Sequence, residues 1–79
     1  MKDEKAIDDL LKALGARLKE LRKKGGFTGG YVGFAIHQLE MQPKQYWEIE
    51  EGHANITMKT LIKVLKPHNI TLEEFFKGL

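Results

Sequence analysis

Leucine and isoleucine recur at helical spacing through the first third of the chain. The set comprises Ile7, Leu10, Leu11, Leu14, Leu18 and Leu21. Steps of three and four residues place such side chains on one stripe of a helix, which we expect over residues 4–24. Acidic residues lie early in this segment and basic residues lie late, as the helix dipole favours, and Gly25-Gly26 ends it. The stripe predicts a long amphipathic helix.

A second helix is expected from an N-cap at Thr28 to about Leu39, with a weak beginning. Gly29, Gly30 and Gly33 each cost about 1 kcal/mol relative to alanine inside a helix. This helix therefore either starts late or contains a glycine kink. Its apolar side is predicted to consist of Tyr31, Phe34, Ala35 and Leu39.

A third helix is expected over residues 43–51. Pro43 suits its first position, because the N–H that proline lacks has no helical partner there. Gly52 ends it. Tyr46 and Ile49 lie three residues apart and are predicted to point inward.

Two shorter helices follow. Thr57 is the expected cap of a fourth helix, which ends before Pro67. Its predicted inward residues are Leu61, Ile62 and Leu65. Thr71 and Glu74 have capping-box spacing and start a fifth helix. No strand-type alternation of useful length occurs, so the sequence predicts an all-α domain with five helices.

Size and composition exclude several classes of protein. The 79 residues permit one domain, residues 1–79, with a thin core. There is no cysteine, and His37, His53 and His68 are scattered, so we expect neither a metal site nor a cofactor. The longest uncharged stretch, residues 25–39, contains five glycines and is no membrane span. With no apolar targeting segment, we expect a cytoplasmic protein, and at this size not an enzyme.

Several short motifs follow one another along the chain. They are Leu14-Gly15, Leu18-Lys19-Glu20-Leu21-Arg22-Lys23, Leu39-Glu40-Met41-Gln42, Ile49-Glu50-Glu51-Gly52, Asn55 with Thr57, and Ile70-Thr71-Leu72-Glu73-Glu74-Phe75-Phe76. As an ordered set, over about residues 10–76, they resemble the Cro and phage-repressor (XRE-type) helix-turn-helix family. The resemblance implies a five-helix, lambda-repressor-like domain whose second and third helices form the helix-turn-helix. It also implies a sequence-specific DNA-binding transcriptional regulator that acts as a homodimer on a near-palindromic site.

The chain departs from the family's pattern at two places. The family carries a polar residue that grips a phosphate just after the cap of the second helix, whereas this chain has Gly29-Gly30. Glu40 stands where the family's turn has glycine. The segment from Thr28 to Leu39 is also longer than is usual in the family. These departures put the order of the second helix in doubt.

The resemblance places the third helix in the major groove. Its base-contact candidates are Pro43, Lys44, Gln45, Trp47 and Glu48. Lys44 would donate to guanine or to a phosphate, Gln45 would pair with adenine, and Glu48 would accept from cytosine N4. Trp47 either contacts a sugar or a thymine methyl, or packs on a partner subunit or a neighbouring helix.

Charge is distributed unevenly along the chain. Residues 40–52 carry four glutamates against one lysine, whereas residues 1–24 carry eight Lys/Arg against five acids. An acidic helix approaches DNA at a disadvantage, so flanking residues must contact the phosphates. The candidates are Arg17, Lys19, Arg22, Lys23, Lys24, Thr28, Asn55, Lys59 and Lys63. Glu50 is expected to be structural, accepting backbone N–H bonds from the loop that follows it.

The apolar C-terminal segment is the predicted dimer surface. Its candidates are Leu72, Phe75, Phe76 and Leu79, although one of the two phenylalanines is expected to close the domain's own core. A second hypothesis is a protein-interaction or antitoxin-like module that keeps the fold but has a degenerate, acidic recognition helix. Its contact patch would consist of Tyr31, Tyr46, Trp47 and Glu48.

Overall fold

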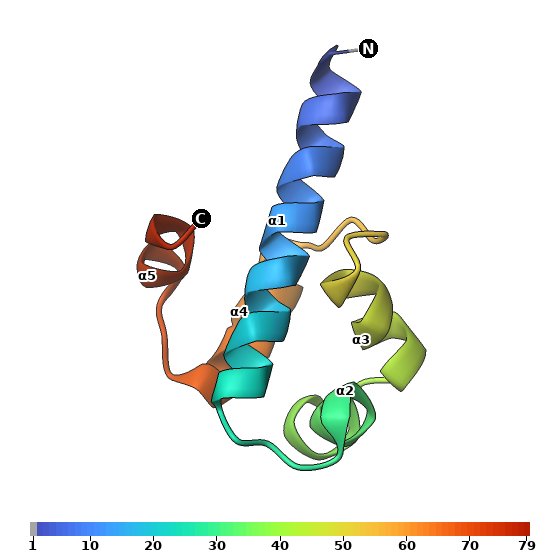
Figure 1. The fold of residues 1–79 in the computed structure, drawn as a ribbon, viewed down its shortest axis with the longest axis vertical. Coiled ribbons are helices and arrows are strands. Elements are labelled where there is room, and N and C mark those ends of the chain that lie inside the picture. Colours follow the sequence, from blue (N-terminus) through green and yellow to red (C-terminus); the bar gives the residue numbers. More distant parts are fainter. Residues whose placement is uncertain (1) are drawn as a thin grey trace.

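The computed structural model describes residues 2–79 and contains helices but no strand within them. The elements are α1 (Lys2–Lys24), α2 (Gly30–Gly33), the π-helix η1 (Phe34–Gln38), α3 (Pro43–Glu50), α4 (Met58–Leu65), the 3-10 turn η2 (Lys66–His68) and α5 (Leu72–Lys77). The predicted all-α fold with five helices is confirmed. In Figure 1, α1 runs along the long axis of the molecule, with α3 on one side and α5 on the other. No helix in residues 2–79 is long and apolar enough to cross a membrane.

The core draws on α1, η1, α3, α4, α5 and the turn between η1 and α3. It contains Leu14, Leu18, Phe34, Ala35, Leu39, Met41, Tyr46, Ile49, Leu61, Val64, Leu65 and Phe75. The prediction for α4 was right for Leu61 and Leu65 and wrong for Ile62, whose side chain is 45% exposed. Val64 takes its place, because positions 61, 64 and 65 share one side of a helix. Phe75 is fully buried, so of the two phenylalanines in α5 it is the one that closes the core.

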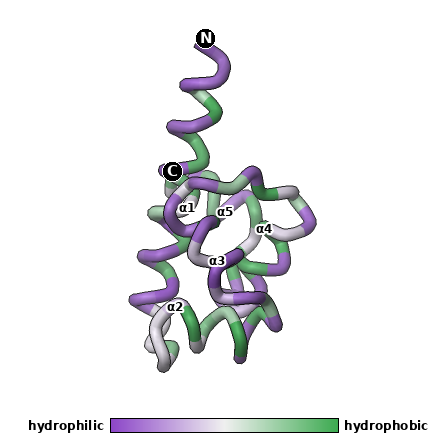
Figure 2. Tube along the Cα trace, turned by 90° about the vertical axis from the view of Figure 1, so that its right-hand side faces the viewer, coloured by the Kyte–Doolittle hydropathy of each residue, from purple (hydrophilic) through white to green (hydrophobic). Residues whose placement is uncertain are grey.

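Only the second half of α1 packs against the body. Leu14 and Leu18 are buried, but Ile7 and Leu10 are 52% and 50% exposed. The expected stripe is therefore continuous along the helix, yet it is covered only from Leu14 onward. Figures 1 and 2 show the N-terminal turns of α1 projecting beyond the other helices. The other helices are shorter and do not extend as far as the tip of α1.

The second helix starts late, which is one of the two alternatives that the glycines left open, and Thr28 is not its cap. The N-cap is Gly29, with φ 85° and no capping side chain, and Gly30 follows with φ 61°. Both angles lie in the left-handed region that glycine adopts without a steric cost. After one α-helical turn the chain continues as the π-helix η1.

A tight turn joins η1 to α3. The Met41 N–H donates to the Ala35 carbonyl at 2.9 Å, and Glu40 between them has φ 51°. This bond reaches back six positions, one more than the bond that closes a Schellman helix end, and a left-handed residue again precedes the donor. Glu40 therefore adopts a left-handed conformation, which glycine adopts without a steric cost. For a residue with a Cβ, that conformation costs about 1–2 kcal/mol.

Candidate nucleic-acid interface

Close packing on α1 determines which side of α3 faces outward. A Cβ added at Gly15 would clash with the carbonyl oxygens of Ile49 and Glu50, so the two helices touch along their backbones. Gly52, with φ 76°, ends the third helix as predicted and lies directly against Lys12. The residues on the opposite side of α3 are consequently left facing solvent.

Beneath α3, Arg22 and Glu50 form a buried ion pair. The Arg22 Nε donates to Glu50 Oε2 at 2.7 Å and Nη2 donates to Oε1 at 3.0 Å. Both residues are less than a tenth exposed. The paired carboxylate raises the pKa of Arg22, while burial and the Glu50 charge raise the pKa of Tyr46, so its phenol stays protonated. Two-pronged pairing of this kind is strong and geometrically specific.

This ion pair corrects two predictions. Glu50 was expected to accept backbone N–H bonds from the following loop, but its carboxylate accepts from the Arg22 side chain instead. Arg22 was a phosphate-contact candidate, but a buried guanidinium held by a carboxylate is not available to an external anion. Glu50 is structural, as expected, through a different partner.

The acidic charge of α3 is partly neutralised from α1. Besides the Arg22–Glu50 pair, the Lys19 Nζ lies 3.7 Å from the Glu51 Oε2. Glu48 is half-buried and makes no ion pair within residues 2–79. Of the three glutamates on or next to α3, Glu48 alone therefore keeps an uncompensated charge near its outward side.

The base-contact candidates lie mainly on the open side of α3. Lys44 and Gln45 are exposed, Trp47 is 37% exposed, and Pro43 and Glu48 are half-buried. The Trp47 ring meets the His53 ring edge-on, with centroids 5.6 Å apart. Trp47 thus packs on the loop that follows its own helix, an arrangement that was not among the alternatives considered from the sequence.

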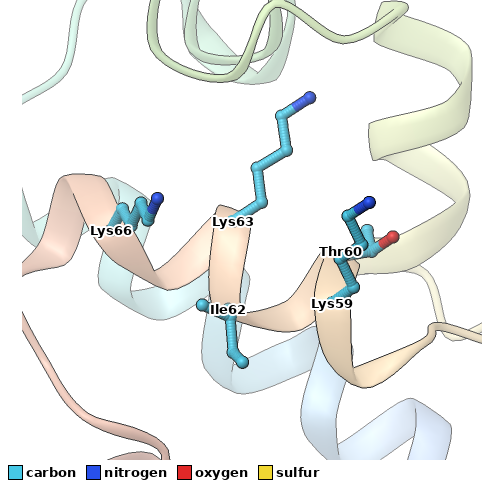
Figure 3. A pocket seen from close by; sticks show the side chains of 5 residues that line it. All are labelled: Lys59, Thr60, Ile62, Lys63 and Lys66. Carbon is cyan, nitrogen blue, oxygen red and sulfur yellow. The ribbon is translucent and has the colours of Figure 1, made fainter.

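A row of lysines follows one side of α4. Lys59, Lys63 and Lys66, with Thr60 and Ile62, line an open hollow of about 650 Å³. In Figure 3, Lys59 and Lys63 extend from α4 toward the side on which α3 is drawn, and Ile62 points the opposite way. Lys66 was not among the sequence candidates. Lys66 lies three residues after Lys63 and seven after Lys59, and this helical spacing is the sequence signal that would have identified it.

The remaining phosphate candidates are scattered. The Arg17 guanidinium lies over the Phe75 ring, 5.6 Å from its centroid, and so faces α5. Lys24 bonds to Glu20 at 3.1 Å on the surface. Lys23, Thr28 and Asn55 are exposed. Among the dimer candidates, Phe75 is unavailable because the core encloses it, Leu72 is half-buried, and Phe76 and Leu79 are exposed.

His68 is half-buried and its ring stacks on the buried ring of Phe34. Their ring centroids are 5.3 Å apart, and the His68 Nε2 is buried without a hydrogen-bond partner in residues 2–79. Burial lowers the pKa of His68 from 6.5, although the Glu50 charge opposes this shift. His37 and His53 are exposed, and within residues 2–79 no group of three or more histidine and acidic side chains is placed to hold a metal ion.

The lowered pKa of His68 predicts that acid destabilises the fold before the carboxylates titrate. Below pH 6.5 the unfolded chain binds a proton that the native chain resists, so stability falls with pH until the native histidine also titrates. Thermal unfolding followed between about pH 7.5 and about pH 5 measures this loss. The variant His68→Phe is expected to flatten the curve in that window, whereas His37→Phe leaves it unchanged. An equal slope in His68→Phe would contradict the assignment.

The exposed side of α3 and the lysines Lys59, Lys63 and Lys66 are the candidate nucleic-acid interface. Comparison of the chain with protein-family models, with curated proteins and with solved structures gave no match in any of the three.

Proposed function

We propose that this protein is a sequence-specific DNA-binding transcriptional regulator. In this proposal η1, the turn at Glu40 and α3 form a helix-turn-helix within a lambda-repressor-like domain, and α3 enters the major groove. One observation carries the proposal. The acidic side of α3 is tied to α1 through Arg22–Glu50 and Lys19–Glu51, while Lys44 and Gln45 on its other side are exposed. Lys59 and Lys63 of α4 extend toward the side on which α3 lies in Figure 3.

The exposed residues of α3 supply donors and acceptors for base edges. Lys44 donates to guanine O6 and N7 or to a phosphate, and Gln45 pairs with adenine through two hydrogen bonds. Glu48 accepts from the cytosine amino group, because a carboxylate has only acceptors. The exposed edge of Trp47 covers a thymine methyl or a sugar. Pro43 is the first residue of α3 and lies at the helix end that enters the major groove in this proposal.

The lysines of α4 supply the phosphate contacts in this proposal. Lys59, Lys63 and Lys66 form one row, and Lys23 and Lys44 are also exposed. Each phosphate neutralised releases counterions, so four or five such contacts give a slope of roughly −4 in log affinity against log salt. Contacts of this type position the helix and do not read sequence.

Charge changes on the open side of α3 are expected to alter DNA affinity in opposite directions. Glu48→Gln removes a like-charge penalty and should strengthen binding to a duplex by about 1 kcal/mol, roughly fivefold, and Lys44→Ala should weaken it by a similar factor. Fluorescence anisotropy with a labelled duplex at low salt measures both. Lys77→Ala is the matched control, because it removes the same positive charge from an exposed position on α5 and is expected to leave the affinity unchanged. If Glu48→Gln and Lys44→Ala both bind like the unmodified chain, α3 does not contact DNA.

A second candidate function rests on Trp47. Its side chain is 37% exposed beside the unpaired Glu48, and exposed aromatic residues are enriched at protein interfaces. A protein-interaction or antitoxin-like module would use this patch for a protein partner. Under this second hypothesis, Trp47→Ala would abolish binding of the protein partner and leave the salt-dependent attraction to DNA unchanged. If α3 reads DNA instead, Trp47→Ala would reduce the preference of the protein for one DNA sequence over others.

A further inference from the structure

The projecting part of α1 carries an apolar stripe that is largely uncovered by the other helices within residues 2–79. Ile7 and Leu10 are half exposed, and Leu11 is half-buried. This stripe continues toward Leu14 on the same side of the helix, in the direction of the core. A helical segment of about a dozen residues is marginal in water without packing. The exposed stripe is therefore a surface that gains stability from a partner.

Two charged residues bracket this stripe. Asp3 precedes Ile7 by four residues and Arg17 follows Leu14 by three, so both lie on the same side of α1 as the leucines. Neither makes an ion pair within residues 2–79. The Arg17 Nε is in addition buried without a hydrogen-bond partner there. The stripe therefore begins with an acid that has no ion-pair partner in residues 2–79 and ends with a base whose guanidinium contacts Phe75 and Gly78 but no carboxylate there.

We infer that α1 pairs antiparallel with α1 of a second copy of this chain. With the twofold axis near Leu10, Asp3 of each copy lies opposite Arg17 of the other, and Ile7 lies opposite Ala13 and Leu14. The pattern is complementary to itself, which is the condition for a symmetric dimer contact. Ala6 and Ala13 flank the stripe and let the two backbones approach closely.

The wider charge distribution of α1 also favours the antiparallel orientation. Residues 2–11 carry four acids against two lysines, and residues 12–24 carry six Lys/Arg against one acid. An antiparallel pair brings the acidic half of each helix beside the basic half of the other. A parallel pair would place like charges together. Complementary potentials of this kind determine orientation more than affinity.

The end of α5 extends the same surface. Gly78 packs directly against the Arg17 guanidinium, so the C-terminal residues lie beside α1 at the base of the stripe. Phe76 and Leu79 are 40% and 46% exposed there. The tip of the second copy's helix would reach this apolar edge. The interface therefore combines the α1 stripe with two of the C-terminal residues predicted from the sequence.

The pairing rests on the proposed function in that it supplies an interface for the proposed homodimer. It is tested without DNA, so a negative result for the α1 pairing does not contradict DNA binding, and a negative result for DNA binding does not contradict the pairing. Sedimentation equilibrium of the full chain over a range of concentrations should show a monomer–dimer equilibrium. Leu10→Lys should raise the dimer dissociation constant at least tenfold with unchanged circular dichroism, because Leu10 is not in the core. Ile62→Lys, at a similarly exposed position on α4, should leave the dimer intact.

A charge exchange tests the antiparallel orientation. Asp3→Arg and Arg17→Glu should each weaken the dimer several-fold, and the double variant should restore it. Asp9→Arg, a reversal on the opposite side of α1, should have a much smaller effect. The inference is overturned if the unmodified chain stays monomeric, if Leu10→Lys dimerises normally, or if Ile62→Lys dissociates the dimer. A double variant no tighter than the single ones would overturn the antiparallel orientation.

Discussion

Glu50→Ala is expected to lower the free energy of unfolding by about 3–5 kcal/mol, because it leaves the Arg22 guanidinium buried without its counter-charge. The guanidinium loses both hydrogen bonds at 2.7 Å and 3.0 Å. A loss of this size is a large fraction of the stability of so small a domain, so the variant should unfold at a much lower urea concentration than the unmodified chain. Urea unfolding followed by circular dichroism measures the change.

Two further variants distinguish the loss of the buried ion pair from the general effect of removing a negative charge. Glu51→Ala removes a carboxylate that lies 3.7 Å from Lys19 near the surface, and should change stability by about 0.5 kcal/mol or less. Replacing both buried partners, Arg22→Met with Glu50→Leu, should restore most of the stability, because no uncompensated charge remains. Equal losses in Glu50→Ala and Glu51→Ala would contradict the role assigned to the buried pair.

Ile49→Ala is the second change with a large expected effect. Ile49 is 4% exposed and its carbonyl lies against Gly15, so the cavity left by truncation sits at the contact between α1 and α3. Core truncations of this type cost about 2–5 kcal/mol. Ile62→Ala removes the same atoms from a side chain that is 45% exposed, and should cost well under 1 kcal/mol. Similar unfolding midpoints for the two variants would contradict the packing described.

The sequence predicts the helices well because their signals are local. Helical spacing located α1, and the Thr71 capping box is present where its residue types indicated. The exposure of Ile7 and Leu10 was missed, because it depends on how far the other helices extend rather than on the pattern of α1 itself. Thr28 was a reasonable cap by residue type, but two left-handed glycines follow it and the helix starts after them.

The candidate site was predicted in part. The exposure of Lys44 and Gln45 agrees with their placement on the open side of α3, while their contacts with bases stay predictions. Arg22 was read as one of several cations at a helix end, because its partner Glu50 is 28 residues away in the chain. Such long-range pairs leave no local pattern. The same pair makes the acidic α3 more compatible with a polyanion than its composition indicated.

Selection of duplexes from a random DNA pool by the purified protein, at low and at physiological salt, tests the central claim most directly. The account predicts enrichment of a near-palindromic site that persists at the higher salt, with half-sites about one turn of DNA apart, roughly 34–36 Å. Loss of that enrichment in Lys44→Ala with Gln45→Ala would assign the reading to α3. Binding without sequence enrichment, or no binding at either salt, would contradict the claim that α3 reads DNA.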